Sequence, residues 1–180
     1  MNFDPKYLVR WGIPGWIYLF IMTIYLFMVD YNKIKEIIFN ENAPVIVASI
    51  SLFIGAGIII GNIMHQISMN LGFVIWTKRK RFFKSEYDLD LEIIKNEYGK
   101  DIQRIYSYRL GNVHALRTLW FSLLFSLLTI LSLSFIYSIS FKVWVLIAIV
   151  VVINLIVLNN WIYFQNNLDY FLRKIKSDFQ

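Results

Sequence analysis

The densest chemistry in the chain is a basic run near its middle, in which phenylalanines interrupt the cations. Five Lys or Arg side chains and two rings stand within seven residues: Lys78, Arg79, Lys80, Arg81, Phe82, Phe83 and Lys84. Cations bind phosphates and rings stack on bases, so this mixture is typical of a site for single-stranded nucleic acid or an anionic nucleotide. It equally fits an anchor that touches anionic lipid headgroups on the cytosolic side of a membrane.

The same chemistry continues further along the chain. More cations and tyrosines follow at Arg104, Tyr106, Tyr108, Arg109 and Arg117. From the start of the basic run to the last of these, the chain holds ten Lys and Arg against six acids, a net charge of +4 that exceeds what topology alone requires. We therefore expect an anionic ligand to bind the basic run together with all of these later side chains except Tyr106.

A second set of polar residues lies inside an otherwise apolar stretch. At about 100° per residue these residues form two neighbouring arcs of a helical wheel: Gly57, Gly61, His65, Ser68 and Gly72, then Asn62, Gln66 and Asn70. Polar groups at membrane depth usually face a cavity or a partner, so all of them except Gly72 are expected to line a water-filled pore. Helix packing is the alternative, because Gly57 and Gly61 let another helix approach closely.

Enzyme and cofactor chemistry finds little support in the sequence. There is no cysteine, no Gly-rich phosphate loop, no His-Glu-x-x-His and no Gly-x-Ser-x-Gly. The two histidines, His65 and His114, are too few for a metal site, and nothing else supports a haem between them. Arg109 and His114 have the Arg-x4-His spacing that resembles HEPN ribonucleases, but they lie close to a predicted membrane crossing where RNA has poor access. We expect no enzyme, no metal and no cofactor.

Four stretches without formal charge must position these side chains. They cover 11–29, 42–77, 118–141 and 143–168, and are 19, 36, 24 and 26 residues long. Since a helix needs about 20 apolar residues to cross a membrane, the first, third and fourth predict one crossing each. The second predicts one crossing that continues past the inner boundary. The chain is 58% apolar and 17% charged, against about a quarter charged in an average soluble domain. The fold class is therefore an all-α polytopic membrane protein with four transmembrane helices.

The positive charges predict the orientation in the membrane. With the N-terminus inside, the inner segments hold 15 Lys and Arg, and the outer loops hold only Lys33, Lys35 and Lys142. The positive-inside rule then places both termini and the long middle segment in the cytosol. Four units follow along the chain: 1–76 with two crossings and a short outer loop, 77–117 as a cytosolic basic hairpin, 118–168 with two crossings, and 169–180 as a cytosolic tail.

The cytosolic segment is predicted to be a helical hairpin. Ser85 and Asp88 have the spacing of a capping box at the start of its first helix, and Gly99 would end that helix. The second helix, from Lys100, would run through Gly111 into the third crossing. The apolar stripe of the hairpin is too small for a domain core, so we expect it to pack against copies of itself or a partner.

Four crossings in one chain leave little room for an internal pathway. We therefore predict a symmetric homo-oligomer, taken to be a tetramer, with a pore on its axis. The chain resembles the small four-helix membrane effectors of bacterial antiphage systems: the channel subunits of Hailong-type systems, the membrane subunit of Kiwa and the four-helix effectors of CBASS. The resemblance covers the whole chain and lies in its size, four crossings, inside termini and the basic hairpin over Thr77–Arg117.

This resemblance implies an inner-membrane channel whose opening depolarises an infected cell. It also implies a cytosolic partner enzyme that makes the gating signal, which in Hailong-like systems is a DNA oligomer. The competing hypothesis is a non-conducting scaffold or anchor in the lipid bilayer, whose basic hairpin docks a cytosolic partner. The two hypotheses differ in one measurable property, ion conduction.

Overall fold

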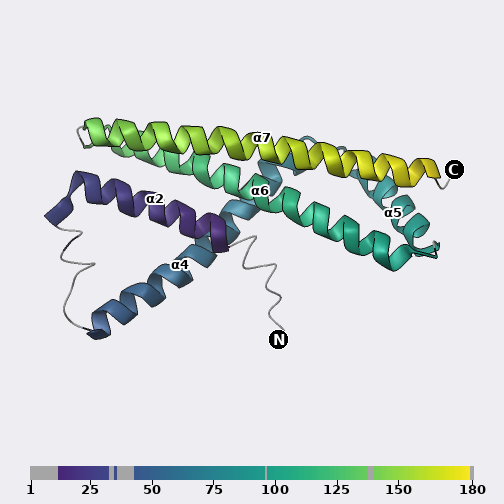
Figure 1. The fold of residues 1–180 in the computed structure, drawn as a ribbon, viewed down its shortest axis with the longest axis horizontal. Helices are drawn as coiled ribbons and strands as arrows, with labels where there is room; N and C mark the ends of the chain where they lie inside the picture. Colours follow the sequence, from purple (N-terminus) through teal and green to yellow (C-terminus); the bar gives the residue numbers. More distant parts are fainter. Residues whose placement is uncertain (1–11, 33–34, 36–42, 96, 138–139, 179–180) are drawn as a thin grey trace.

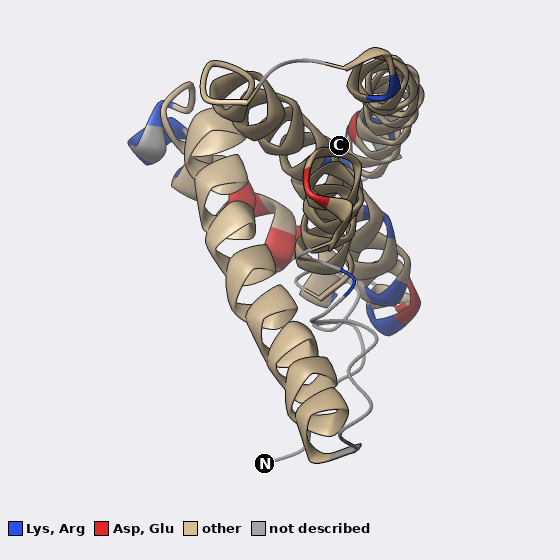
Figure 2. Cartoon of the chain, turned by 90° about the vertical axis from the view of Figure 1, so that its left-hand side faces the viewer, with Lys and Arg blue, Asp and Glu red and all other residues tan. Residues whose placement is uncertain are grey.

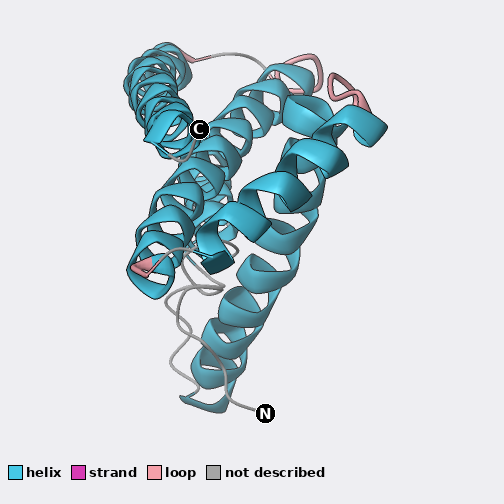
Figure 3. Cartoon of the chain, turned by 90° about the vertical axis from the view of Figure 1, so that its right-hand side faces the viewer, coloured by secondary structure: helices cyan, strands magenta, loops and turns pink. Residues whose placement is uncertain are grey.

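The computed structural model describes residues 12–32, 35, 43–95, 97–137 and 140–178, and these residues are all-α (Figure 3). The predicted fold class is confirmed at this level. The cations Lys6 and Arg10 and most of the predicted outer loop lie outside the described residues. In chain order the helices are α2 (Ile13–Val29), α4 (Ala43–Met69), the π-helix η2 (Asn70–Val74), α5 (Arg79–Lys95), α6 (Gly99–Leu133) and α7 (Phe141–Asp178) (Figure 1).

Three helical stretches in the described residues are long and apolar enough to cross a membrane. They are Pro44–Val74, Gly99–Leu133 and Phe141–Ser177. A shorter apolar helix, α2, has 17 residues, the lower end of the range that spans hydrocarbon. Charged residues form short coloured patches on the largely tan cartoon of Figure 2. These helices support the prediction of a helical membrane protein.

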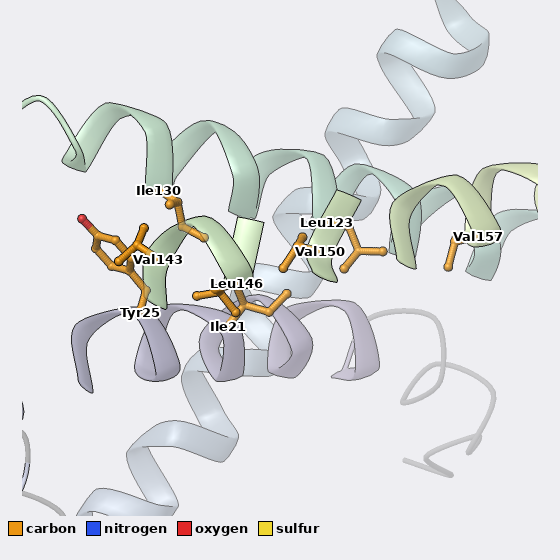
Figure 4. Packing of buried hydrophobic residues seen from close by; sticks show 8 residues of the cluster. All are labelled: Ile21, Tyr25, Leu123, Ile130, Val143, Leu146, Val150 and Val157. Atoms are coloured by element: carbon orange, nitrogen blue, oxygen red, sulfur yellow. The ribbon is translucent and has the colours of Figure 1, made fainter. Parts of the chain in front are cut away.

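The long antiparallel helices α6 and α7 lie side by side and form the axis of the molecule, with α2 packed along one half of the pair (Figure 1). The apolar core lies between these three helices. Figure 4 shows its eight buried members, with Val157 standing apart from the others along α7: Ile21, Tyr25, Leu123, Ile130, Val143, Leu146, Val150 and Val157. Burial of these side chains fixes the half of α6 and α7 that the sequence predicts to lie in the membrane.

Glycines determine how α4 crosses α2. Pro14 stands in the first turn of α2, and the next residue, Gly15, lies against Gly57 and Gly61. A Cβ atom on Gly15 would overlap the carbonyl of Gly57 and lie 2.6 Å from the nitrogen of Gly61. Trp16 covers Gly57, and its Nε1 donates a hydrogen bond of 3.2 Å to the carbonyl of Ile54. The helix that approaches the glycine pair is therefore α2 of the same chain.

The N-terminal half of α4 stands away from the other helices (Figure 1). Its apolar side chains are accordingly open, with Val47 63% exposed and Leu52 75% exposed. Lipid tails are as apolar as these side chains, so their exposure does not by itself require a protein partner.

The hairpin differs from the prediction at both ends of its first helix. α5 begins at Arg79, and Ser85 lies inside it, so the predicted capping box is wrong. Lys and Arg are good helix formers, and no glycine or proline interrupts the sequence of α5. Gly99 opens α6 instead of ending α5, which ends at Lys95. As predicted, α6 continues through Gly111 without a break.

The segment predicted as a tail continues α7 as helix to Asp178. Its last turns pack against the hairpin: Ile175 forms a buried apolar cluster with Leu89 and Ile93 of α5. Ile102 of α6 packs against the same cluster. Part of the apolar stripe that we expected to contact copies or a partner is thus covered by α7 of the same chain.

Candidate functional site

The basic run occupies the first turns of α5. Phe82 turns inward, with its ring edge-on to Phe73 of η2 at a centroid distance of 5.0 Å, whereas Phe83 is 61% exposed. The side chain of Arg79 lies outside the described part of the chain. The four remaining cations are exposed: Lys78, Lys80, Arg81 and Lys84. This surface presents charge to solvent without enclosing a ligand.

A cavity of about 750 Å³ between α6 and α7 holds three of the other predicted ligand residues, Arg104, Tyr108 and Arg109. We call it the α6–α7 cavity. It is lined by Arg104, Ile105, Tyr108, Arg109, Asn112, Phe164 and Asn167. The lining contains two guanidinium groups and no carboxylate, together with two rings and two amides. Guanidinium groups bind phosphates, rings stack on bases and amides form hydrogen bonds with base edges, so this set matches an anionic nucleotide.

Within the α6–α7 cavity, α7 holds one arginine in place. Arg109 Nη1 donates hydrogen bonds to the side-chain oxygen of Asn167 and to its backbone carbonyl, the latter at 3.4 Å. The Arg109 guanidinium also lies over the ring of Phe171, with 4.6 Å from Cζ to the centroid. Arg104 is exposed and forms no hydrogen bond or ion pair with the described residues, so its donors are available to a ligand.

The predicted ligand residues fall into three places instead of one. No residue of α5 lines the α6–α7 cavity. α5 instead packs near Ile102 and Tyr106, on another face of α6. Arg117 belongs to neither group, because it is buried further along α6, where α6 meets α4.

A buried polar cluster joins α6 to α4. Thr118 Oγ1 lies 2.9 Å from His65 Nδ1 and 3.2 Å from Ser68 Oγ, and it donates to the carbonyl of His114 at 2.8 Å. A hydroxyl has a single proton, so His65 Nδ1 must be the donor to Thr118. Arg117 completes what we call the His65–Thr118 cluster, donating from Nη2 to His114 Nδ1 at 2.6 Å. His114 therefore carries its proton on Nε2.

Arg117 is the only formal charge in this cluster. Its side chain is 4% exposed, and its Nε has no hydrogen-bond partner in the described part of the chain. Nη2 also contacts the sulfur of Met69. A Cβ on Gly72, within the π-helix, would lie 2.8 Å from Arg117 Cδ, so the glycine leaves room for the arginine. Buried cations beside a membrane crossing and π-helical turns both tend to mark functional positions.

Replacing Thr118 with valine should destabilise the contact between α4 and α6. The change removes the buried hydroxyl that contacts both His65 and Ser68 of α4, so two hydrogen bonds between the helices are lost. We expect a loss of about 1–3 kcal/mol, measured by thermal unfolding in detergent. Thr23→Val is the matched control, since the hydroxyl of Thr23 bonds only to Leu19 of its own helix. Equal losses for the two variants would mean that the cluster contributes no more than a bond within one helix.

Burial separates the predicted pore-lining residues into two groups. Gly57, Gly61 and Ser68 are buried against other helices of the chain, and His65 is half-buried in the cluster. The other three predicted pore-lining residues are amides that are spaced four residues apart, and all three are exposed. We call them the amide face: Asn62, Gln66 and Asn70. The amide face lies on the side of α4 and η2 that points away from the rest of the chain.

Other polar groups of the apolar helices bond within the chain. Ser122 Oγ donates to the carbonyl of Pro14 at 2.6 Å, which joins α6 to α2. Asn154 Nδ2 donates to the carbonyl of Trp120 at 3.1 Å, which joins α7 to α6. These side chains connect helices and do not line a water-filled path.

The two histidines take part in the cluster as hydrogen-bonding groups. Their rings lie 6.1 Å apart, edge to face. Among the described residues, no three His, Cys, Asp or Glu side chains are grouped as metal ligands. Arg109 binds Asn167 while His114 binds Arg117, so the Arg-x4-His pair does not converge on one point.

Sequence reasoning missed the side chains that complete these sites from other helices. Phe164, Asn167 and Phe171 of α7 form the far wall of the α6–α7 cavity or hold Arg109, and Thr118 is the centre of the cluster. One signal was visible, because Asn167 is an amide at the end of the last charge-free stretch. No family model matches the chain, and neither curated proteins nor solved structures give a match.

Proposed function

We propose that the chain is one subunit of an oligomeric membrane channel that an anionic cytosolic ligand gates. One observation carries this proposal. A single continuous helix, α6, holds both the arginines that we propose bind the ligand and the polar cluster that forms hydrogen bonds with α4. The arginines proposed to bind the ligand are therefore connected, through α6, to α4, the helix that carries the exposed amides.

The arrangement of helix ends supports four crossings with cytosolic termini. The C-terminal ends of α2 and α6 and the N-terminal ends of α4 and α7 lie toward one end of the molecule, and α5 and the end of α7 lie at the other (Figure 1). In this topology α5, the N-terminal end of α6 and the C-terminal end of α7 lie on the cytosolic side of a bacterial inner membrane. The cations of α5 then obey the positive-inside rule.

The amide face supports assembly into an oligomer. Apolar side chains on α4 can face lipid, but Asn62 and Gln66 are exposed amides that lipid tails cannot satisfy. Copies of α4 around an axis, four in the symmetric tetramer that we propose, would give these amides water or one another as partners. The amide face then lines the inner half of the pore, and apolar residues nearer the outer end of α4 form its constriction.

Gating follows from the shared helix. A nucleotide or a short single-stranded nucleic acid would place a phosphate against Arg104 and Arg109 and a base against Tyr108 or Phe164. Drawing α6 and α7 together around the ligand shifts the His65–Thr118 cluster on the same helix. Because Thr118 and Arg117 contact α4 and η2, that shift moves the amide face relative to the pore axis.

Leucine at Asn62 or Gln66 should lower the conductance of the open channel. Single-channel currents of the purified protein in planar bilayers, with and without an added deoxyoligonucleotide, measure this directly. Removing a pore-lining amide raises the barrier for a hydrated ion, and we expect unitary conductance to fall by about twofold or more. Gln103→Leu is the matched control, because Gln103 is an exposed amide on the part of α6 that the proposed topology places outside the membrane. Absence of current from the unsubstituted protein, with or without oligonucleotide, would reject the channel.

The biological role that we propose is antiphage defence by membrane depolarisation, with the ligand made by a cytosolic partner enzyme. It rests on the architectural resemblance to four-helix antiphage effectors. Coexpression with a nucleotidyltransferase from a neighbouring gene should arrest growth and collapse the membrane potential, and a voltage-sensitive dye measures that collapse.

A non-conducting scaffold is the alternative function, and one observation favours it. Gly57, Gly61 and Ser68 are buried within the chain, and Ser122 and Asn154 bond to neighbouring helices. Much of the polarity in the helices is thus used for packing. In a scaffold the exposed cations of α5 would dock a cytosolic partner, and the bilayer experiment described above separates the two functions.

A further inference from the structure

A second cavity, distinct from the α6–α7 cavity, lies where three cytosolic helical segments meet. It has a volume of about 560 Å³ and is enclosed by α5, Tyr106 of α6 and the last turns of α7. We call it the three-helix cavity. Its lining combines both signs of charge: Glu86, Asp169, Arg173 and Lys176. The α6–α7 cavity differs in this respect, because the charged side chains that line it are all cations.

Part of this charge forms no hydrogen bond or ion pair within the described part of the chain. Arg173 and Glu86 form no hydrogen bond or ion pair with the described residues. Lys176 donates to Ser85 at 2.8 Å, and Asp169 accepts from Gln165 at 3.0 Å, which holds these two side chains in place. A cavity that presents a free guanidinium and a free carboxylate matches a ligand that carries both an anion and a cation.

The remaining walls suit the other parts of such a ligand. Phe82, Leu89 and Leu172 provide apolar surface. Burial, together with the nearby carboxylates of Glu86 and Asp90, raises the pKa of Tyr106, so its hydroxyl stays protonated and able to donate.

The depth of the three-helix cavity points to a lipid. Asp169 is the first charge after the last charge-free stretch, and Phe82 packs against Phe73 at the end of η2. Both place the cavity at the inner boundary of the proposed crossings, where headgroups of the inner leaflet lie.

We infer that the three-helix cavity binds a zwitterion that joins a phosphate to a primary ammonium group, and that this zwitterion is the phosphoethanolamine headgroup of an inner-leaflet lipid. The phosphate binds Arg173 and Lys176, and the ammonium binds Glu86 and Asp169. The inference rests on the proposed placement of α5 at the cytosolic surface, but it does not require that the protein conduct ions or bind nucleotides.

The test measures lipid binding to the full chain by native mass spectrometry in detergent, with phosphatidylethanolamine and phosphatidylglycerol as probes. The unsubstituted protein should prefer phosphatidylethanolamine. Arg173→Gln should weaken its binding by about tenfold, because a charge-assisted contact to the phosphate is lost. Lys174→Gln is the matched control, since Lys174 is exposed on α7 outside the cavity and its loss should leave binding unchanged.

Glu86→Gln gives the sharper discrimination. Phosphatidylglycerol lacks the ammonium, so this variant should lose affinity for phosphatidylethanolamine alone and bring the two lipids to within about twofold of each other. Asp88→Asn, an exposed acid of α5 outside the cavity, should keep the preference. Circular dichroism confirms the fold of each variant.

Three outcomes would overturn the inference. Equal affinity of the unsubstituted protein for the two lipids would show that the cavity does not select a zwitterion. Equal effects of Arg173→Gln and Lys174→Gln would show that the phosphate does not bind in the cavity. Binding of soluble glycerophosphoethanolamine without binding of the lipid would assign the cavity to a free metabolite instead of the bilayer. None of these outcomes depends on current or on oligonucleotide, so they leave the proposed channel to its own experiment.

Discussion

Replacing Gly15 with alanine is expected to separate α2 from α4 and to destabilise the protein strongly. The added Cβ would overlap the carbonyl of Gly57 and lie 2.6 Å from the backbone nitrogen of Gly61. Both atoms belong to a helix backbone, which cannot move aside as a flexible side chain would. Overpacking of this kind costs about 1–3 kcal/mol or more.

The same substitution at Gly55 provides the control for the Gly15 variant. Gly55 lies in α4, two residues before Gly57, and a Cβ there would meet nothing within 4 Å. Alanine is the better helix former by about 1 kcal/mol, so Gly55→Ala should be neutral or stabilising. Thermal unfolding in detergent, followed by circular dichroism, compares the two. Equal melting temperatures would show that α2 and α4 do not approach as closely as the structure has them.

Charge reversal at both arginines of the α6–α7 cavity is expected to abolish ligand binding. Arg104→Glu with Arg109→Glu replaces two phosphate contacts by two repulsions, and we expect the affinity for a fluorescent deoxyoligonucleotide to fall by about 100-fold. Anisotropy titrations at several salt concentrations measure it, and the slope of log affinity against log salt should decrease by about two. Arg104→Glu alone tests the same point without disturbing the fold, because Arg104 forms no hydrogen bond or ion pair with the described residues.

The matched control for this double variant replaces two cations by glutamates on α5 instead of on α6. The sequence alone points to charge reversal at Arg79 and Arg81 for loss of binding, because their run is the densest. Lys80→Glu with Arg81→Glu changes two exposed cations that enclose no cavity. We expect a smaller loss from it, through the general field of the surface. A larger loss from the α5 variant would place the ligand on the basic run and reject the α6–α7 cavity.

The sequence predicts the number and approximate position of the apolar helices because long charge-free stretches dominate it. It predicts the ends of helices less well. Arg79 opens α5 because nothing in the basic run opposes a helix, whereas the pattern at Ser85 and Asp88 suggested a later start. Similarly, the charges after Leu168 do not interrupt α7, although a change in polarity there suggested a separate tail.

The candidate site was predictable where one helix carries it and not where two helices meet. Arg104 and Tyr108, four residues apart, share a face of α6, which spacing alone shows, and Arg109 adjoins that face. Their partner Asn167 lies 58 residues from Arg109, and its role depends on which face α7 presents to α6. The same reason hides the contact between Thr118 and His65, 53 residues apart. Which faces of two distant helices meet is decided by side-chain packing, and a helical wheel of one helix holds no information about it.

The continuous length of α7 has a mechanical consequence. Its 38 residues form a rod of about 57 Å at 1.5 Å per residue. The N-terminal half of this rod is packed in the apolar core through Val143, Leu146 and Val150, and its C-terminal end is attached to α5 through Ile175. A rod pivoting near its N-terminal end amplifies rotation into displacement, and a tilt of about 10° moves its far end by about 10 Å. α7 is thus a lever, on which a small tilt in the apolar core becomes a large displacement of α5.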